Sequence, residues 1–301
     1  MQQHRPFLAL GLRLLSALVL SVLLLLVKML AESGVAVGEI VFWRHVLTPP
    51  IVLAWLALQK DGMARLRTRR LGAHALRAGV GMSNMAILFT ATSLLPLAEV
   101  TTLGFTTALF AVLIAAMVLR EHVGPWRWTA VLLGFAGVLV IAQPGGQHID
   151  PLGATLALAS SLGVVMINYQ IRDLARTEEP IKIVFWFGMF GTLIGAVALP
   201  FFITPHAPHE WLLLVGLGVV GVLGQLLLTA SLRYGKVSTV IVMDYTGLVW
   251  SALLGWLVWD YLPGIATLLG APLIISAGII IAWREHRLSK EGRAPSPVSA
   301  Q

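Results

Sequence analysis

The residues most able to bind or move a charged group are the few ionisable side chains inside long apolar stretches. Asp244 lies about eight residues into one such stretch, roughly 12 Å deep at about 1.5 Å per residue. An ionisable group at the centre of a membrane-spanning helix costs at least about 2.5 kcal/mol, so it faces a partner or an aqueous cavity. We expect Asp244 either to bind a cationic substrate group or carry a coupling proton, or else to form a buried salt bridge or stay protonated.

Arg44 lies about six residues into another apolar stretch. Its planar guanidinium suits a carboxylate or phosphate, which it holds through two parallel hydrogen bonds. The alternatives are a pair with Asp244, a pair with Glu39, or a side chain that extends to the membrane interface. Glu39 and Glu99 lie near the ends of their stretches, where we expect them to line a vestibule, and Glu39 is a second candidate for carrying a coupling proton.

Neutral polar and aromatic residues also occur in the middle of these stretches. Amides and phenols in hydrocarbon need hydrogen-bond partners, and neighbouring helices usually supply them. Deep tryptophans pack more often than they bind, but two of them beside an acid and an arginine would suit a zwitterion with a planar or apolar body. The candidates for lining a substrate site are Tyr245, Trp186, Trp250, Asn84 and Asn168.

These residues stand out because the rest of the chain is apolar. Of its 301 residues, 57% are hydrophobic and 12% are charged, whereas soluble domains have about 25% charged residues. A membrane-spanning helix needs roughly 20 apolar residues, and continuous apolar runs favour helices over strands. The sequence predicts an all-α polytopic membrane protein with ten spans, at residues 7–30, 38–58, 73–95, 97–119, 126–141, 151–171, 181–203, 211–232, 237–258 and 264–283.

The basic residues predict how the chain is oriented. Ten spans place both termini on one side, and the connections on that side, with the C-terminal tail, contain all the Lys and Arg found between spans. The opposite connections contain Glu32, Asp150, Glu210 and Asp260 instead. The positive-inside rule therefore places both termini in the cytoplasm. The net charge of +7 is a topology signal facing anionic lipid, not a nucleic-acid surface.

The chain also repeats itself weakly. Residues 40–43 (IVFW) recur at 183–186, and residues 100–102 (VTT) resemble 237–239 (VST). Each half has five spans, an odd number, so the halves insert with opposite orientation. Secondary transporters share this plan, with substrate sites near the bilayer midplane. We predict a first repeat over residues 1–143, a second over 144–288 and a disordered cytoplasmic tail over 289–301.

Several motifs along residues 7–287 resemble the EamA-type, ten-helix branch of the drug/metabolite transporter superfamily. Two departures are that Ala108 stands where members often have proline, and Asp260 where they have glutamate. The motifs are LPLAE at residues 95–99, LRE at 119–121, GFAGV at 134–138, QPG at 143–145 and WRE at 283–285.

The resemblance implies a secondary active transporter that works by alternating access in the bacterial inner membrane. Such proteins move a small metabolite, commonly an amino acid or a related zwitterionic or cationic compound. Similar sequences are described as S-adenosylmethionine uptake transporters, so uptake of that compound or another nucleoside-like metabolite is the alternative. The direction of transport and the coupling ion stay open.

Other classes of function lack their characteristic motifs. The chain has no cysteine, which excludes disulfides, thiolate metal sites and cysteine nucleophiles. It contains no phosphate-binding loop, no His-Glu-x-x-His and no Gly-x-Ser-x-Gly. We therefore expect no catalytic residue, no metal and no cofactor, with a membrane enzyme or scaffold as the remaining alternative. The expected partners are a small-molecule substrate and membrane lipid, without nucleic acid, and a homodimer is compatible with the sequence.

Overall fold

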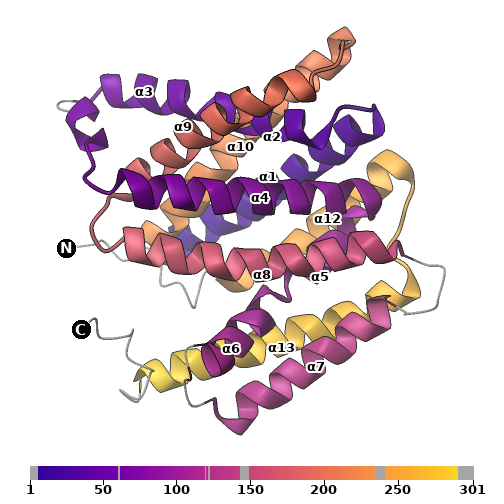
Figure 1. Cartoon of the computed structure of the whole chain (residues 1–301). Coiled ribbons are helices and arrows are strands. Elements are labelled where there is room, and N and C mark those ends of the chain that lie inside the picture. Colours follow the sequence, from indigo (N-terminus) through magenta and orange to yellow (C-terminus); the bar gives the residue numbers. More distant parts are fainter. Residues whose placement is uncertain are drawn as a thin grey trace.

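Every regular element of the described chain is a helix, which confirms the predicted all-α class (Figure 1). The boundary predicted at residues 143 and 144 and the predicted tail from residue 291 lie outside the described residues. A computed structural model describes residues 6–59, 62–118, 120, 123–142, 149–234 and 241–290. Its helices are α1 (Pro6–Glu32), α2 (Val37–Val46), α3 (Thr48–Ala57), η1 (Gly62–Leu66), α4 (Leu71–Leu94), α5 (Leu97–Gly104), α6 (Thr107–Met117), α7 (Pro125–Ala142), α8 (Pro151–Leu174), α9 (Pro180–Ala198), η2 (Leu199–Phe201), α10 (Pro208–Tyr234), η3 (Ile241–Tyr245), α12 (Thr246–Trp259) and α13 (Ile265–Lys290).

Most of the predicted spans are helices long and apolar enough to cross a membrane, so the chain is a polytopic membrane protein. The third predicted span is α4, which is less apolar because it carries His74, Arg77 and Asn84. The ninth consists of η3 and the 14-residue α12. The eight that meet both criteria are Phe7–Glu32, Val37–Ala57, Leu97–Met117, Pro125–Ala142, Pro151–Leu174, Pro180–Phe201, Pro208–Leu228 and Ile265–Arg284.

Three of the predicted spans are interrupted. The second breaks at Leu47, between α2 and α3, because proline is tolerated in the first turn of a helix but not in its interior; Pro49 lies in the first turn of α3. The fourth breaks between α5 and α6 although Ala108 replaces the usual proline, and Thr106 Oγ1 donates to the carbonyl oxygen of Leu103 there. The ninth changes from the 3-10 helix η3 to α12 after Tyr245.

The helices of the two predicted halves pack in corresponding pairs. α1 packs against α10. In the same way α8, the expected counterpart of α1, packs against α4, the expected counterpart of α10. α2 packs against α9, α5 against α12 and α7 against α13. Figure 1 shows α4 beside α8, and shows α6, α7 and α13 grouped below them. Two related five-helix halves that face each other would produce this pairing.

Small residues allow the closest of these helix contacts. A side chain at Gly137 of α7 would lie 2.7 Å from the carbonyl oxygen of Gly270 on α13, so neither position has room for one. Gly134 of α7 lies against the side chain of Leu109 on α6 in the same way. Close packing through glycine is typical of membrane helices, since it increases van der Waals contact between backbones.

Candidate functional site

Asp244 forms a salt bridge with Arg13 of α1. Arg13 Nε donates to Asp244 Oδ1, and Arg13 Nη2 donates to Asp244 Oδ2. Each donor–acceptor distance is 2.5 Å, so the pair is bidentate. The side chain of Arg13 is 10% exposed and that of Asp244 is 37% exposed. Of the alternatives for Asp244, the structure shows the salt bridge, and the substrate-binding and proton-carrying roles stay predictions.

Asp244 also differs from expectation in its backbone environment. It belongs to η3, directly before α12, and so does not lie inside a continuous α-helix. Tyr245, the next residue, packs its ring edge-on against Phe105 at 4.8 Å between centroids. Its hydroxyl fills the space that a side chain at Gly278 of α13 would need. Tyr245 thus holds η3 between α5 and α13, and any substrate contact by this residue remains a proposal.

A line of hydroxyl groups joins α1, α5 and α12. Ser251 of α12 shares hydrogen bonds with Thr101 of α5, at 2.8 Å, and with Ser21 of α1, at 3.4 Å. Ser21 also donates to the backbone carbonyls of Ala17 and Gly247. These neutral groups are satisfied by one another, as expected for polar side chains between membrane helices.

Arg44 lies on α2 and is 5% exposed. Its side chain crosses to α10, where a side chain at Gly221 would lie 2.5–2.9 Å from the Cδ, Nε and Cζ atoms of Arg44. Its Nε has no hydrogen-bond partner, and no ion pair links Arg44 to any acid in the described part of the chain. The structure therefore shows neither the pair with Asp244 nor the pair with Glu39.

Two further basic residues pack against one ring on α9, and sequence analysis missed both. Arg77 of α4 is 7% exposed, and its Cζ lies 4.3 Å from the ring centroid of Phe187 on α9. His45, which follows Arg44 in α2, packs edge-on against the same ring at 4.8 Å. We call Arg44, His45, Arg77 and Phe187 the arginine cluster.

Hydrogen-bonding capacity in the arginine cluster is largely unused. His45 Nδ1 lies 3.0 Å from the carbonyl oxygen of Val41 and donates to it, while Nε2 has no partner. Arg77 Nε and Nη1 also have none. Over the described residues, no acid pairs with either arginine. Two buried guanidinium groups without an acid destabilise the folded protein unless an anion binds to them, since charges inside a membrane are paired or face water.

The missed arginines carried a readable signal. Arg13 and Arg77 both lie within predicted spans, at 7–30 and 73–95, where any charged residue is a candidate functional residue. Both sit near the ends of those spans, where an arginine can also extend to the interface. What the sequence does not contain is the rotation of each helix, which decides whether such a side chain faces lipid or the bundle.

The remaining candidates have other surroundings than the arginine cluster, although Trp186 directly precedes Phe187 in α9. Asn84 is 7% exposed at the contact of α4 with α8, where its Oδ1 has no partner. Asn168 of α8 is exposed. Trp250 of α12 has a buried Nε1 without a partner. Trp186 of α9 donates to the backbone carbonyl of Leu66 in η1 over 3.0 Å, at one end of the bundle.

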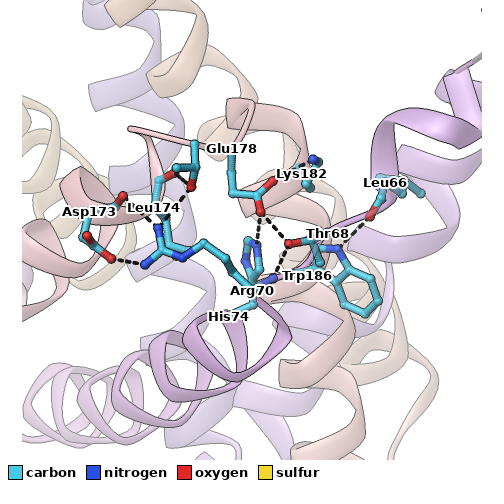
Figure 2. A network of polar contacts seen from close by, with 10 residues as sticks. Leu66, Thr68, Arg70, His74, Asp173, Leu174, Glu178, Lys182 and Trp186 are labelled. Carbon is cyan, nitrogen blue, oxygen red and sulfur yellow. Dashed lines mark hydrogen bonds and ion pairs between the residues drawn. The ribbon is translucent and has the colours of Figure 1, made fainter.

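Figure 2 shows the polar network at that end, which we call the basic end and which includes residues 62–70 and 175–179. Glu178 accepts from Thr68 over 2.5 Å and pairs with Lys182 at 2.6 Å. Burial alone would raise the pKa of the Glu178 carboxyl, but these hydrogen bonds outweigh it and lower the pKa. Arg70 pairs with Asp173. The network ties the connection before α4 to the one before α9.

A different cluster lies at the opposite end, which we call the acidic end and which includes residues 33–36, 202–207 and 260–264. Glu39 is fully buried in the first turn of α2. Its Oε1 lies 2.7 Å from His206 Nε2 and accepts from Trp43 over 3.3 Å. Glu39 Oε2 has no partner. Glu99 accepts from Tyr261, and both burial and this carboxylate raise the pKa of Tyr261 to about 12.

A profile of the EamA-like transporter family matches residues 7–143 and 151–283. The chain therefore belongs to this family, in the drug/metabolite transporter superfamily. The two matches each cover five of the predicted spans. One solved structure aligns over 96% of this chain and 99% of its own, with a TM-score of 0.64 and 20% identity, which shows a shared fold.

Relatives with described functions are transporters. The pseudopaline exporter CntI of Pseudomonas aeruginosa is 30% identical over 275 residues, which is 90% of this chain and 94% of that protein. A riboflavin transporter of Vibrio cholerae is 28% identical over 229 residues, 75% of this chain and 76% of that protein. An S-adenosylmethionine uptake transporter of Rickettsia prowazekii is 24% identical over 250 residues, 83% of this chain and 84% of that protein. The family function is transport across a membrane.

Proposed function

We propose that this protein is a secondary active transporter that moves a small carboxylate-bearing metabolite, an amino acid or a related compound, by alternating access. The observation that carries the proposal is the arginine cluster, in which Arg44 and Arg77 are buried without a counter-charge among the described residues. A substrate carboxylate would supply that charge, because guanidinium groups bind carboxylates bidentately. Phe187 would pack against the rest of the substrate.

The arrangement of the helices supports the mechanism. The arginine cluster draws on α2 and α4 from the first predicted half and on α9 and α10 from the second. In inverted-repeat transporters, rocking of one half against the other exposes such a site to each side in turn. The family matches to residues 7–143 and 151–283 fit two such halves. We place both termini in the cytoplasm of a bacterium, with the protein in its inner membrane, from the positive-inside rule.

S-adenosylmethionine or another nucleoside-like metabolite is the second candidate substrate. The relative from Rickettsia prowazekii favours it. That compound also bears a carboxylate, so the same arginines would bind it, and its cationic part would need a carboxylate. Asp244 is 37% exposed but is held by Arg13, so binding a cation there would require it to exchange partners. The relatives include an exporter and an uptake transporter, so they favour neither direction.

Transport by purified protein in liposomes tests the proposal. Uptake of a labelled amino acid and of labelled S-adenosylmethionine is measured twice, once with a pH gradient across the membrane and once without one. We expect uptake of one of these compounds. Arg44→Gln should abolish most of the uptake, while Arg176→Gln, which removes an exposed charge at the basic end, should leave it unchanged. Equal transport by parent and Arg44→Gln would contradict the assigned site. A lipid converted in detergent without any gradient would instead indicate an enzyme.

A further inference from the structure

We propose that His206, held between Glu39 and Glu210, is a proton-binding site that closes the acidic end when it is protonated. The inference rests on the proposed transport function, since it assigns that transport a coupling site. Sequence analysis named Asp244 and Glu39 as candidates for carrying a coupling proton, and it grouped neither His206 nor Glu210 with Glu39.

The geometry places a carboxylate against each nitrogen of one imidazole ring. Nε2 of His206 lies 2.7 Å from Glu39 Oε1, and Nδ1 lies 3.4 Å from Glu210 Oε2. The side chain of His206 is 1% exposed. A neutral imidazole has only one N–H, so one of its nitrogens would direct a lone pair at a carboxylate. The imidazolium form donates to Glu39 and places its charge beside Glu210, whose carboxylate does not hydrogen-bond to Nδ1 in the structure.

The charges around His206 are few and predominantly acidic. Glu39 approaches from α2, and Glu210 from α10, where its Oε2 also accepts from the backbone N–H of Ala207. His209 on α10 is exposed, and Arg44 lies about 7.5 Å further along α2 than Glu39. The rings of Trp43 and Trp211 cover the cluster; Trp211 packs edge-on against His206 at 5.1 Å between centroids. Two carboxylates therefore face one imidazole within a small, enclosed space.

Protonation is linked to the position of α2 because the cluster joins two parts of the fold. Glu39 belongs to α2. Glu210 belongs to α10, and His206 belongs to the connection before α10. Beside them the ring of Phe202 fills the space above Gly38. Opening the acidic end would separate α2 from this connection, break the Glu39–His206 contact and hydrate both carboxylates. Proton binding therefore favours the closed state, and α2 carries the change to Arg44.

The basic end also has a buried histidine, His74, but the carboxylate near it has other hydrogen-bond donors. His74 Nε2 lies 4.0 Å from Glu178, a carboxylate that already has hydrogen bonds from Lys182 and Thr68. Acid and base are balanced there, so the His74 ring is not required to carry a proton. The proposed proton dependence thus belongs to the acidic end.

Labelling of an introduced cysteine tests the proposal, because the native chain has none. Val35 is 4% exposed at the acidic end and packs with Leu214 and Leu217 of α10, so Val35→Cys should react with a membrane-impermeant maleimide only when that end opens. Ser33→Cys, at an exposed position on the same connection, corrects for the pH dependence of the reaction itself. We expect the ratio of the two labelling rates to rise several-fold between pH 5.5 and pH 8.

Substitutions at the cluster decide the outcome. His206→Gln keeps a hydrogen-bond donor but cannot take up a proton, so the ratio should no longer depend on pH, whereas His209→Gln should retain the parent profile. If His206→Gln is not recovered as a monodisperse protein, Glu210→Gln replaces it and should move the midpoint of the labelling ratio to lower pH, since one carboxylate is lost. An unchanged profile in the variant used overturns the proposal. The measurement needs no substrate, so a pH-dependent ratio without transport would contradict the proposed function and leave the proton site standing.

Discussion

The Arg13–Asp244 pair and the arginine cluster place the same cation, a guanidinium, inside the bundle in opposite circumstances. Arg13 is 10% exposed and its charge is matched by a bidentate carboxylate from η3. Arg44 is 5% exposed and Arg77 is 7% exposed, and the described residues supply neither with an acid. The charge of Arg13 is balanced within the protein, whereas the charges of Arg44 and Arg77 need a ligand to balance them.

This difference separates a structural charge from a binding charge. The Arg13–Asp244 pair connects α1 to the ninth predicted span, so it holds two parts of the fold together. The arginine cluster leaves donors without acceptors on α2 and α4, and a substrate carboxylate would satisfy them. Substitutions in the first region should therefore change stability more than affinity, and substitutions in the second should do the reverse.

The largest effect is expected from Asp244→Asn. It leaves Arg13 nearly buried without a counter-charge, and removal of one partner from a buried pair costs about 3–5 kcal/mol. Because Asp244 is 37% exposed, we expect the lower end, about 3 kcal/mol of unfolding free energy. Denaturant unfolding of the detergent-solubilised protein measures it.

The double variant Arg13→Gln/Asp244→Asn is the control, since it removes both charges and should recover part of the lost stability. Asp244→Asn with parental stability would mean that the pair does not hold the fold. The same variant also tests the predicted coupling role of Asp244. Transport equal to the parent at every pH would exclude that role.

The next largest effect is expected from Arg44→Gln or Arg77→Gln. Each removes charge-assisted hydrogen bonds to the proposed carboxylate, worth about 1.5–3 kcal/mol, or roughly 10-fold to 100-fold in substrate affinity. Stability should be unchanged or higher, since an unpaired buried charge is lost. Equilibrium binding of labelled substrate and denaturant unfolding, measured on the same preparation, separate the two effects. Destabilisation without a change in substrate affinity would mean that these arginines hold the fold together and do not bind substrate.

Much of the fold was predictable from the sequence, because it follows from composition along the chain. Apolar runs of about 20 residues determine where helices span a membrane. Pro49 alone explains why α2 ends where it does. The break between α5 and α6 occurs without a proline, at a point where Thr106 bonds its hydroxyl to the backbone, and no run of apolar residues reveals it.

The site was less predictable, because its contacts join residues far apart in sequence. The partner of Asp244 lies 231 positions away, and only the rotation of α1 brings Arg13 towards η3. Trp186 has the sequence context of a deep residue but bonds to η1 at the basic end. Depth along a helix can be counted from the sequence, whereas the face of the helix that carries the residue depends on tertiary packing.

A smaller effect is expected from Phe187→Leu. The cation–π contact with Arg77 is worth about 0.5–2 kcal/mol, so its loss should weaken substrate binding by a few-fold. Phe201→Leu is a matched control, because Phe201 is 82% exposed at the far end of the same predicted span. Equilibrium binding measures both variants. Equal affinities would restrict the arginine cluster to its two guanidinium groups and remove the ring from it.

The smallest effect is expected from Glu178→Gln at the basic end. The Glu178 side chain is buried, but glutamine keeps an acceptor for Thr68, and Lys182 in the first turn of α9 can extend to water. The folded protein lowers the pKa of Glu178, so the network contributes stability above the unfolded carboxyl value of about 4.3 and loses it as pH falls through the folded value. At pH 7 the variant should be less stable by about 1 kcal/mol, since one hydrogen bond is lost, and once pH falls below the folded pKa of Glu178 it should match the parent. Glu179→Gln, at a more exposed carboxylate, is the control. A loss as large as that from Asp244→Asn would mean that Lys182 cannot reach water once its partner is lost, as we expect for Arg13.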